Sequence, residues 1–293
     1  MGHRHWIFGV GLAASLLLGG LAFADDAPAP APDKGGYTVL DPTPADQLRG
    51  FCTDRPTKST GACTVDAGHL QYETDLINFT DDRSDGVTTR TWLFTNPTLK
   101  LGLTNTLDVE VNMVPVETVT ARDRTSGART SVTGVGDLYA RFKLNLMGDD
   151  GGNVAIALVP YVKAPTARAG IGNGAVEGGL VTPLVFNLPR DWQLTIDPEA
   201  DLLANASGAG RHANVSGLLS FSRPLSKTLT ASVEVWGDAN FDPAGTVRQY
   251  SFDLGLAWVP ARHPNVQLDG GVNLGLNDVT PGTQVYLGLS QRF

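Results

Sequence analysis

The sequence predicts an all-β protein, a transmembrane up-and-down antiparallel β-barrel of about 12 strands. Polarity alternates residue by residue along many segments, as in 229–235 and 266–276, and a period of two is typical of a strand with one apolar side. Short turns alternate with longer linkers between these segments, as in a meander that crosses a bilayer. Glycine accounts for 34 of the 293 residues, which does not suit a helical protein.

The charge and hydropathy of the chain exclude several classes of protein. Its formal net charge of −8 argues against a nucleic-acid partner, because phosphate binding needs a basic surface. After residue 24 no apolar run approaches the ~18 residues of a membrane-spanning helix. Ligand patterns such as Cys-x-x-Cys and His-Glu-x-x-His are absent, and the glycine-containing segment 132–137 precedes no predicted helix. We therefore expect no metal, no cofactor and no phosphate loop.

The N-terminus has the three parts of a secretory signal peptide, predicted over residues 1–24. Arg4 supplies the positive charge, residues 7–21 are apolar, and Ala22-Phe23-Ala24 offers a cleavage site. A membrane anchor is the alternative, but the apolar run is short and ends in a cleavage pattern. The chain is therefore expected to be exported.

A Pro-rich spacer follows the signal peptide and is predicted over residues 25–50. Its part from 26 to 36 contains Ala-Pro repeats and should be extended and unpacked. We expect this spacer in the periplasm, where it is a candidate contact with the cell wall or with a periplasmic partner.

Cys52 and Cys63 are the only cysteines in the sequence. An even number of cysteines in an exported chain predicts one disulfide, here closing a short loop. A metal site is the alternative, but no His or Asp cluster surrounds the pair. We expect residues 51–63 to form a disulfide-stapled segment and residues 64–293 to form the barrel.

The alternating segments define the expected strands and their connections. The strands are expected near 64–80, 88–103, 105–118, 133–148, 151–165, 175–188, 191–205, 211–225, 227–240, 248–259, 264–276 and 281–293. The longer linkers are expected at 81–87, 119–132, 166–174, 206–210 and 241–247, with a shorter one at 277–280 on the same side. An even number of strands places both chain ends on one side of the membrane, the periplasmic side.

A secreted β-sandwich is the natural rival, because its strands also alternate. The segments here are ~10–15 residues long, which fits tilted membrane strands better than the ~5–6 residues of globular sheets. Aromatic residues also gather near the segment ends, as in the interfacial girdles of membrane barrels. They are Phe186, Trp192, Phe221 and Trp258 beside the short turns, and Phe79, Trp92, Trp236 and Phe241 beside the linkers.

The C-terminal segment 285–293 alternates and ends in an aromatic residue. Tyr286, Leu287, Leu289 and Phe293 resemble the recognition signal of bacterial outer-membrane proteins, although Gln291 interrupts the outward face. The resemblance implies the barrel assembly machinery and outer-membrane lipid as partners.

Several blocks of sequence resemble a family of outer-membrane transporters named for the meta-pathway of phenol degradation. These blocks are Thr53-Asp54-Arg55-Pro56-Thr57-Lys58, 64–73, 134–138, 160–166 and 287–293, in the family's order. The resemblance covers nearly all of the chain beyond the spacer. It implies an outer-membrane barrel that passes small compounds.

The alternate residues of each strand are expected to face the barrel interior, since the apolar face meets lipid. The expected inward acids are Glu73, Asp75, Asp108, Glu110, Asp137, Glu177, Asp197, Glu199, Asp201, Glu234, Asp253 and Asp269, and the expected inward bases are Lys100, Arg141, Lys143 and Lys163. An acidic lining attracts cations, so the lumen is expected to prefer cations or neutral solutes. The alternative is a plugged interior in which these charges pair with one another. We assign selectivity to Glu73, Asp75, Lys100, Asp108, Glu110, Arg141, Lys143, Asp197, Glu199 and Asp201.

Aromatic and glycine residues share the inward positions. Trp92, Phe94, Tyr139, Tyr161 and Tyr286 are expected inside, either as contacts for an aromatic solute or as filling. Gly136, Gly179, Gly271, Gly275 and Gly288 would widen the lumen or mark bends.

An outer-membrane lipase is the least favoured alternative. His212, Asn214 and Ser216 are the one stretch to test, and all three have inward parity, whereas a lipid-cleaving nucleophile should face lipid. We assign no catalytic residue. The sequence thus predicts a passive outer-membrane channel for small solutes, aromatic compounds among them, with a non-conducting interaction or structural barrel as the alternative.

Overall fold

A computed structural model describes residues 33–293 of the chain. The expected signal peptide and the first part of the spacer lie outside these residues. The described part is all-β, with two 3-10 turns at Ala45–Gln47 and Pro189–Asp191. None of its helices is long and apolar enough to cross a membrane.

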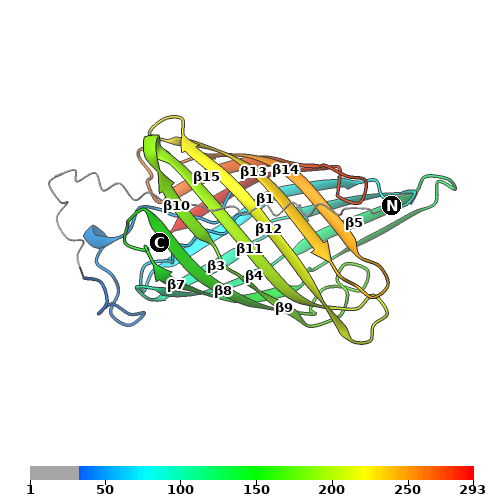
Figure 1. Ribbon diagram of the computed structural model, residues 1–293, viewed down its shortest axis with the longest axis horizontal. Coiled ribbons are helices and arrows are strands. Elements are labelled where there is room, and N and C mark those ends of the chain that lie inside the picture. Colours follow the sequence, from blue (N-terminus) through cyan, green and yellow to red (C-terminus); the bar gives the residue numbers. More distant parts are fainter. Residues whose placement is uncertain (1–32) are drawn as a thin grey trace, which may run out of the picture. The chain divides into compact units, whose positions relative to one another are not determined.

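Sixteen antiparallel strands form one sheet, drawn in Figure 1. They are β1 (Leu70–Asp82), β2 (Val87–Phe94), β3 (Thr98–Thr104), β4 (Leu107–Met113), β5 (Val116–Asp123), β6 (Arg129–Gly134), β7 (Leu138–Met147), β8 (Val154–Ala164), β9 (Glu177–Val181), β10 (Leu184–Leu188), β11 (Trp192–Ala204), β12 (Arg211–Pro224), β13 (Leu229–Asn240), β14 (Val247–Trp258), β15 (Val266–Gly275) and β16 (Thr283–Arg292).

The sixteen strands make a closed barrel of twelve spans, as the sequence predicts. Four spans are each broken into two strands, namely β2–β3, β4–β5, β6–β7 and β9–β10. Strand β1, for example, pairs with both β2 and β3. Strands β1 and β16 pair along ten register positions, from Gln71↔Arg292 to Asp81↔Thr283, and this pairing closes the barrel.

Prolines account for three of the four breaks, which the sequence reading did not foresee. Pro97, Pro115 and Pro183 each lie between the two halves of a broken span, and a proline has no N–H for the ladder. The break before Pro97 also reverses the expected faces of two aromatics. Trp92 and Phe94 point outward instead of inward, since they pair with Phe79 and Ile77 of β1.

Two boundaries differ from the expected ones. The first strand begins at Leu70, so residues 64–69 precede the barrel wall. The linker expected at 119–132 is mostly strand, because β5 and β6 continue as a hairpin that projects beyond the other strands (Figure 1). The barrel therefore has a short-turn end, with the 105–106 and 189–191 turns and the C-terminus, and an opposite long-loop end.

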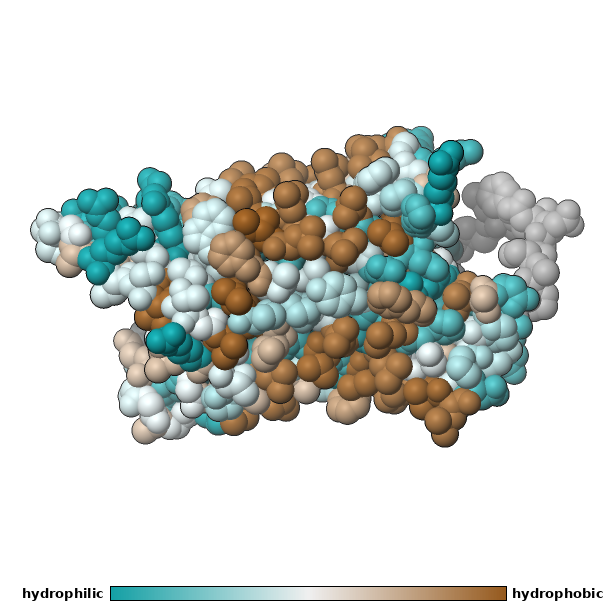
Figure 2. All heavy atoms as spheres, turned by 180° about the vertical axis from the view of Figure 1, so that it is seen from behind, coloured by the Kyte–Doolittle hydropathy of each residue, from teal (hydrophilic) through white to brown (hydrophobic). Residues whose placement is uncertain are grey.

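The wall has an apolar outer face and a polar inner face. Leucines such as Leu99, Leu256 and Leu287 stand outward with 48%, 50% and 60% of their surface exposed. The buried side chains are mostly polar or charged. Figure 2 shows apolar residues over most of the middle of one side of the molecule and polar residues toward its two ends. This arrangement is that of a membrane barrel rather than a sandwich with an apolar core.

The described end of the spacer packs against the short-turn end. Lys34 is buried, with its ammonium 2.9 Å from Asp150 and 3.6 Å from Asp66. The Arg49 backbone N–H donates to Asp66, and its guanidinium to the carbonyl of Thr64. The expectation of an unpacked spacer is therefore wrong at Lys34, because the buried Asp66 and the more exposed Asp150 hold it.

Candidate functional site

The disulfide segment, residues 51–63, lies inside the barrel and is called the plug here. Cys52 and Cys63 are joined, as the sequence predicts. Side chains of the plug contact inward residues of β1, β3, β7, β14 and β15. This segment is expected from the sequence as a stapled stretch before the barrel, but in the structure it enters the lumen.

Asp54 anchors the plug to two lysines of the wall. Its carboxylate accepts hydrogen bonds from Lys100 and, at 2.7 and 2.8 Å, from Lys143. Lys100 also lies 2.7 Å from Glu73, and both lysines lie within 3.7 Å of Glu110. Burial by itself raises the pKa of Asp54, but the two ammonium groups outweigh it and hold the pKa well below its usual range.

Arg55 forms the second anchor and bridges two strands. Its guanidinium lies 2.7 Å from Asp75 of β1 and 2.7 Å from Asp269 of β15, and 5.8 Å from the centre of the Tyr286 ring. Burial lowers the pKa of Arg55, but the hydrogen bonds and charges of the two carboxylates raise it above its ordinary value. The guanidinium therefore stays charged at any physiological pH.

Lys58 forms the third anchor on β13 and β14. Its ammonium lies 2.9 Å from Asp253, 2.6 Å from the Ser251 hydroxyl and 4.7 Å from the centre of the Trp236 ring. Trp236 thus faces the lumen and contacts the plug. Its expected place in an interfacial girdle is wrong, since the alternation along β13 turns residue 236 to the same side as residue 234.

Backbone groups of the plug add hydrogen bonds to the wall. The N–H groups of Lys58 and Ser59 donate to Glu234 at 3.0 and 3.2 Å. The N–H of Thr60 donates to Asp197 at 2.7 Å. These bonds hold the plug through its main chain as well as through its side chains.

Inward glycines leave the space into which the plug fits. A Cβ at Gly255 would lie 2.7 Å from Pro56, and a Cβ at Gly288 would overlap the Arg55 guanidinium. Substituting Gly255 would shift the plug at Pro56 and Thr57, and substituting Gly288 would shift the Arg55 guanidinium. We expected inward glycines to widen the lumen, but at Gly288 the plug fills the space.

Two further glycines make room for side chains of the wall. A Cβ at Gly179 would overlap the Asp201 carboxylate, to which the Tyr161 hydroxyl donates at 2.7 Å across β9. Gly271 lies against the Tyr286 hydroxyl in the same way. Strand Gly therefore serves cross-strand contacts at these positions.

The plug separates two polar cavities in the lumen. The outer cavity, toward the long-loop end, has a volume of about 540 Å³, and the inner cavity, toward the short-turn end, has about 680 Å³. Asp54, Arg55, Ser59 and Thr60 line both cavities. The lumen is therefore hollow on either side of the plug, and these four residues lie between the two cavities.

The sequence-predicted selectivity residues fall into three groups. The plug engages Glu73, Asp75, Lys100, Lys143 and Asp197, directly or through a shared lysine. Asp108 accepts a hydrogen bond from the Val65 N–H, and Glu110 lies among Lys100, Lys143 and Arg141. Arg141, Glu199 and Asp201 remain outside the plug contacts.

Sequence reasoning missed Asp54, Arg55 and Lys58 as lumen residues. The alternation rule identifies strands, and these three lie in an irregular loop. The signal that was available is a run of charged residues enclosed by the two cysteines of an exported chain.

The lipase candidates do not assemble into a catalytic arrangement. His212 Nδ1 lies 2.9 Å from the Asn205 side chain, and the Ser216 hydroxyl donates to Glu199 at 3.2 Å. Asn214 donates to Asp201 and Asp238. In residues 33–293 no hydrogen bond joins Ser216 to His212, and no group of three or more His, Cys, Asp or Glu side chains is arranged to hold a metal ion.

The C-terminal strand divides its residues between the two faces. Tyr286 faces the lumen and is buried, and Leu287 faces outward. The backbone N–H of Phe293 donates to the Leu70 carbonyl at 2.8 Å, which ties the chain end to the start of β1.

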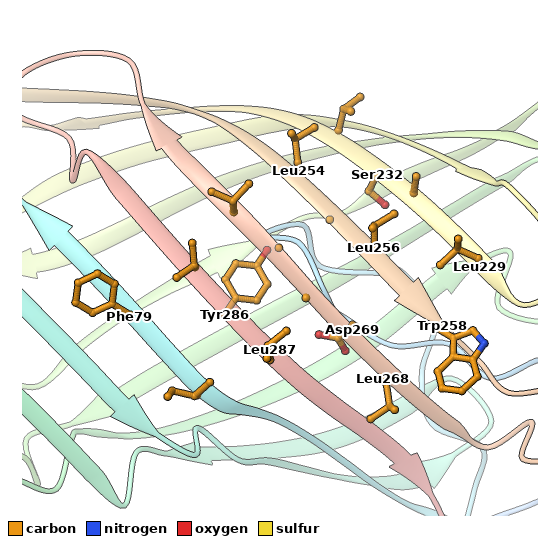
Figure 3. Close-up of a pocket in the computed structure, with 18 of the residues that line it drawn as sticks. Phe79, Leu229, Ser232, Leu254, Leu256, Trp258, Leu268, Asp269, Tyr286 and Leu287 are labelled. Atoms are coloured by element: carbon orange, nitrogen blue, oxygen red, sulfur yellow. The ribbon is translucent and has the colours of Figure 1, made fainter.

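A third cavity, of about 980 Å³, follows the wall from β13 to β16 and on to β1 and β2. Figure 3 shows Leu254, Leu256, Leu268 and Leu287 along these strands, with Asp269 and Tyr286 among them. Its lining is almost wholly apolar because it includes the outward face of these strands.

Comparisons with known proteins place the fold among outer-membrane barrels. An outer-membrane channel from Pseudomonas putida F1 matches at TM-score 0.62 and 13% identity, covering 81% of this chain and 100% of that one. The NanC porin (TM-score 0.49, 10% identity, 76% and 98% covered) and the β domain of the Bordetella autotransporter BrkA (0.49, 14%, 77% and 99%) are less similar. No curated protein sequence matches.

A sequence model of one family matches residues 53–293. The match begins inside the plug and runs to the last residue of the barrel, so it covers both parts of the described lumen. The chain belongs to the family described as "Putative MetA-pathway of phenol degradation".

Proposed function

We propose that the protein is a passive outer-membrane channel for small solutes, whose lumen is closed by a displaceable plug. The observation that carries this proposal is the pair of cavities inside the barrel whose shared lining residues all belong to the plug. Ion pairs and hydrogen bonds hold the plug against the wall. The backbone that continues from the plug into β1 is its covalent connection to the wall, since the disulfide joins two residues of the plug. Such a closure can move without breaking the barrel.

The proposal requires two partners, the lipid of the outer membrane and the barrel assembly machinery. Outer-membrane lipid covers the leucines of the outer face, and the strand ending at Phe293 is the segment that the barrel assembly machinery binds. We place the N-terminal end of the chain on the periplasmic side, because the described part of the spacer packs against the short turns. Short turns on the periplasmic side are the rule for barrels of this kind.

The lumen charges support a preference for cations. Each basic anchor of the plug pairs with carboxylates of the wall, as Arg55 does with Asp75 and Asp269. The wall nevertheless keeps carboxylates such as Glu199 and Asp201 for which the described residues offer no Lys or Arg within 4.0 Å. When the plug moves, these groups and those it uncovers give the pathway a negative lining.

Ionic current through refolded mature protein in a planar bilayer, in a KCl gradient, tests the proposal. The double variant Arg55→Ala/Lys58→Ala removes two plug anchors and leaves the wall sequence unchanged. We expect larger and more frequent current steps than in the wild type, with a cation-selective reversal potential. The matched control is Arg129→Ala/Lys227→Ala, which removes two exposed bases and should conduct like the wild type.

Other outcomes count against the channel. A folded barrel that carries no current in the wild type or in either variant would favour the interaction or structural role. An anion-selective reversal potential would contradict the cation preference of the pathway. The proposal that the protein is a channel would still stand.

A further inference from the structure

The outer cavity holds two charged side chains that the plug does not use, Arg141 and Glu199. The other charges of its lining are engaged with the plug or with one another, as the Asp54, Lys100 and Glu110 cluster illustrates. A volume of about 540 Å³ is within the usual range for small-molecule sites. The two free charges are therefore the groups available to a solute.

Arg141 is the exposed base of this cavity. Its side chain is 35% exposed, whereas Lys143 two residues away is 1% exposed. The nearest carboxylate, Glu110, lies 3.9 Å away, too far for a hydrogen bond, and Glu110 is shared with both lysines. The guanidinium also lies 5.7 Å from the centre of the Tyr139 ring. Its planar fork is thus free to bind a carboxylate in a bidentate manner.

Glu199 is the free acid of the same cavity. Its carboxylate accepts a hydrogen bond from the Ser216 hydroxyl at 3.2 Å, and no Lys or Arg of residues 33–293 lies within 4.0 Å of it. Asp201, the next residue on the same face of β11, accepts hydrogen bonds from the Tyr161 hydroxyl and the Asn214 amide, and its carboxyl lies beside that of Glu199. This side of the cavity therefore favours a cationic group.

Two aromatic rings line the cavity beside Arg141. Tyr139 and Tyr161 both line the cavity, with ring centres 6.1 Å apart at an angle of 42°. The register pairs Arg141 with Tyr161 on β8, and Val181 of β9 pairs with Glu199 on β11. Because Tyr161 pairs with Gly179 and Gly179 with Asp201, the row of Arg141 reaches Asp201 after three strand steps, about 14 Å at the backbone, and Glu199 lies two residues further along β11. Both side chains line the same cavity.

We propose that the outer cavity binds small aromatic zwitterions, with the carboxylate on Arg141, the ammonium at Glu199 and the ring against Tyr139 and Tyr161. A plain carboxylate meets only Arg141 and is repelled by the acidic side, and a plain amine meets only Glu199 and is repelled by Arg141. The inference deepens the proposed channel function, because it names the solute class that the cavity admits to the plug.

Binding to the folded full-length mature protein in detergent, measured by calorimetry, tests this proposal. The probes are 4-(aminomethyl)benzoate, which carries both charges at opposite ends of one ring, 4-methylbenzoate, which carries only the carboxylate, and 4-methylbenzylamine, which carries only the ammonium. We expect the first probe to bind at least about tenfold more tightly than either of the others, the effect of one charge-assisted contact.

Two substitutions assign the ends of the ligand. Arg141→Gln should lower the affinity for 4-(aminomethyl)benzoate and for 4-methylbenzoate. The affinity for 4-methylbenzylamine should stay the same or rise. Glu199→Gln should instead lower the affinity for 4-(aminomethyl)benzoate and for 4-methylbenzylamine. Arg129→Gln and Asp46→Asn, which remove exposed charges elsewhere, are the matched controls. Heat-modified migration on gels shows whether each variant is folded.

The outcomes separate this inference from the channel proposal, because binding is measured without transport. Equal affinities for the three probes, or affinities that neither substitution changes, would overturn the zwitterion site even if current is observed. Selective binding of 4-(aminomethyl)benzoate that both substitutions abolish would establish the site even in a barrel that carries no current.

Discussion

Gly288 lies directly beneath the Arg55 guanidinium, in a position where any side chain would overlap it. The register places Gly288 of β16 between Asp75 of β1 and Asp269 of β15. The guanidinium therefore crosses one strand above the glycine and reaches a carboxylate on each neighbour, at 2.7 Å in both cases. A glycine of the last strand and a loop near the N-terminus thus form one functional unit.

Gly288→Ala should displace the plug without disturbing the lipid-facing wall. The added methyl group occupies the place of the guanidinium, so Arg55 has to move from its position between the two carboxylates and its hold on them weakens. We expect larger and more frequent current steps in planar bilayers. Gly217→Ala is the control, because its nearest neighbour would be 3.8 Å from the new Cβ. If Gly288→Ala conducts like the wild type and like Gly217→Ala, Arg55 does not hold the closure.

Asp54→Asn should destabilise the plugged barrel. The substitution leaves Lys100 and Lys143, which are 3% and 1% exposed, without the charge that lies between them. Removing one partner from a buried ion pair costs about 3–5 kcal/mol when the other is left unpaired. Lys100 keeps Glu73 and both lysines keep Glu110, so the loss here should be smaller than that. Unfolding in urea, followed by gel mobility, should show this loss.

The control for this loss is Asp46→Asn, an exposed acid in the 3-10 turn before the plug. It should unfold with the wild-type midpoint. Equal midpoints for the two variants would mean that solvent enters the plug contacts and screens them.

Much of the barrel could be predicted because the alternation of polar and apolar residues within each strand determines which side chains face lipid. Alternation such as Asp253-Leu254-Gly255-Leu256 identifies both the strand and its lipid face, and the structure places these leucines outward. The number of spans follows in the same way. Alternation could not predict the faces of Trp92 and Phe94, because the break at Pro97 reverses which residues face the lumen from β2 to β3.

The plug could not be predicted, since its contacts are distant in sequence and have no period. Arg55 and Asp269 are separated by 214 positions, and nothing in either neighbourhood points to the other. Alternation assigns wall residues such as Asp75 and Lys143 to the lumen, but it does not reveal that their partners lie in a loop. An excess of inward charge on a barrel wall is thus a signal that a charged segment elsewhere in the chain fills the lumen.

The plug contact of Asp54 should persist in mild acid. Its pKa is held below its usual range by Lys100 and Lys143, so its charge contributes stability above the pKa of the unfolded chain, about 3.9, and loses it as the pH falls further. The difference in urea midpoint between the wild type and Asp54→Asn should therefore stay constant from pH 7 to about 5 and shrink only below about 4. A difference that changes steadily between pH 7 and 5 would indicate a raised pKa instead.

The Cys52–Cys63 disulfide should set how often the plug leaves its seat. It closes the loop that carries Asp54, Arg55 and Lys58, and closing a loop of this size restricts the free chain by at most ~3 kcal/mol. Reductant should raise the frequency of current steps in the wild type. The variant Cys52→Ser/Cys63→Ser should show the raised frequency from the start and no response to reductant. If thiol labelling shows that the disulfide is reduced while the wild-type current is unchanged, the ion pairs of Asp54, Arg55 and Lys58 hold the plug without it.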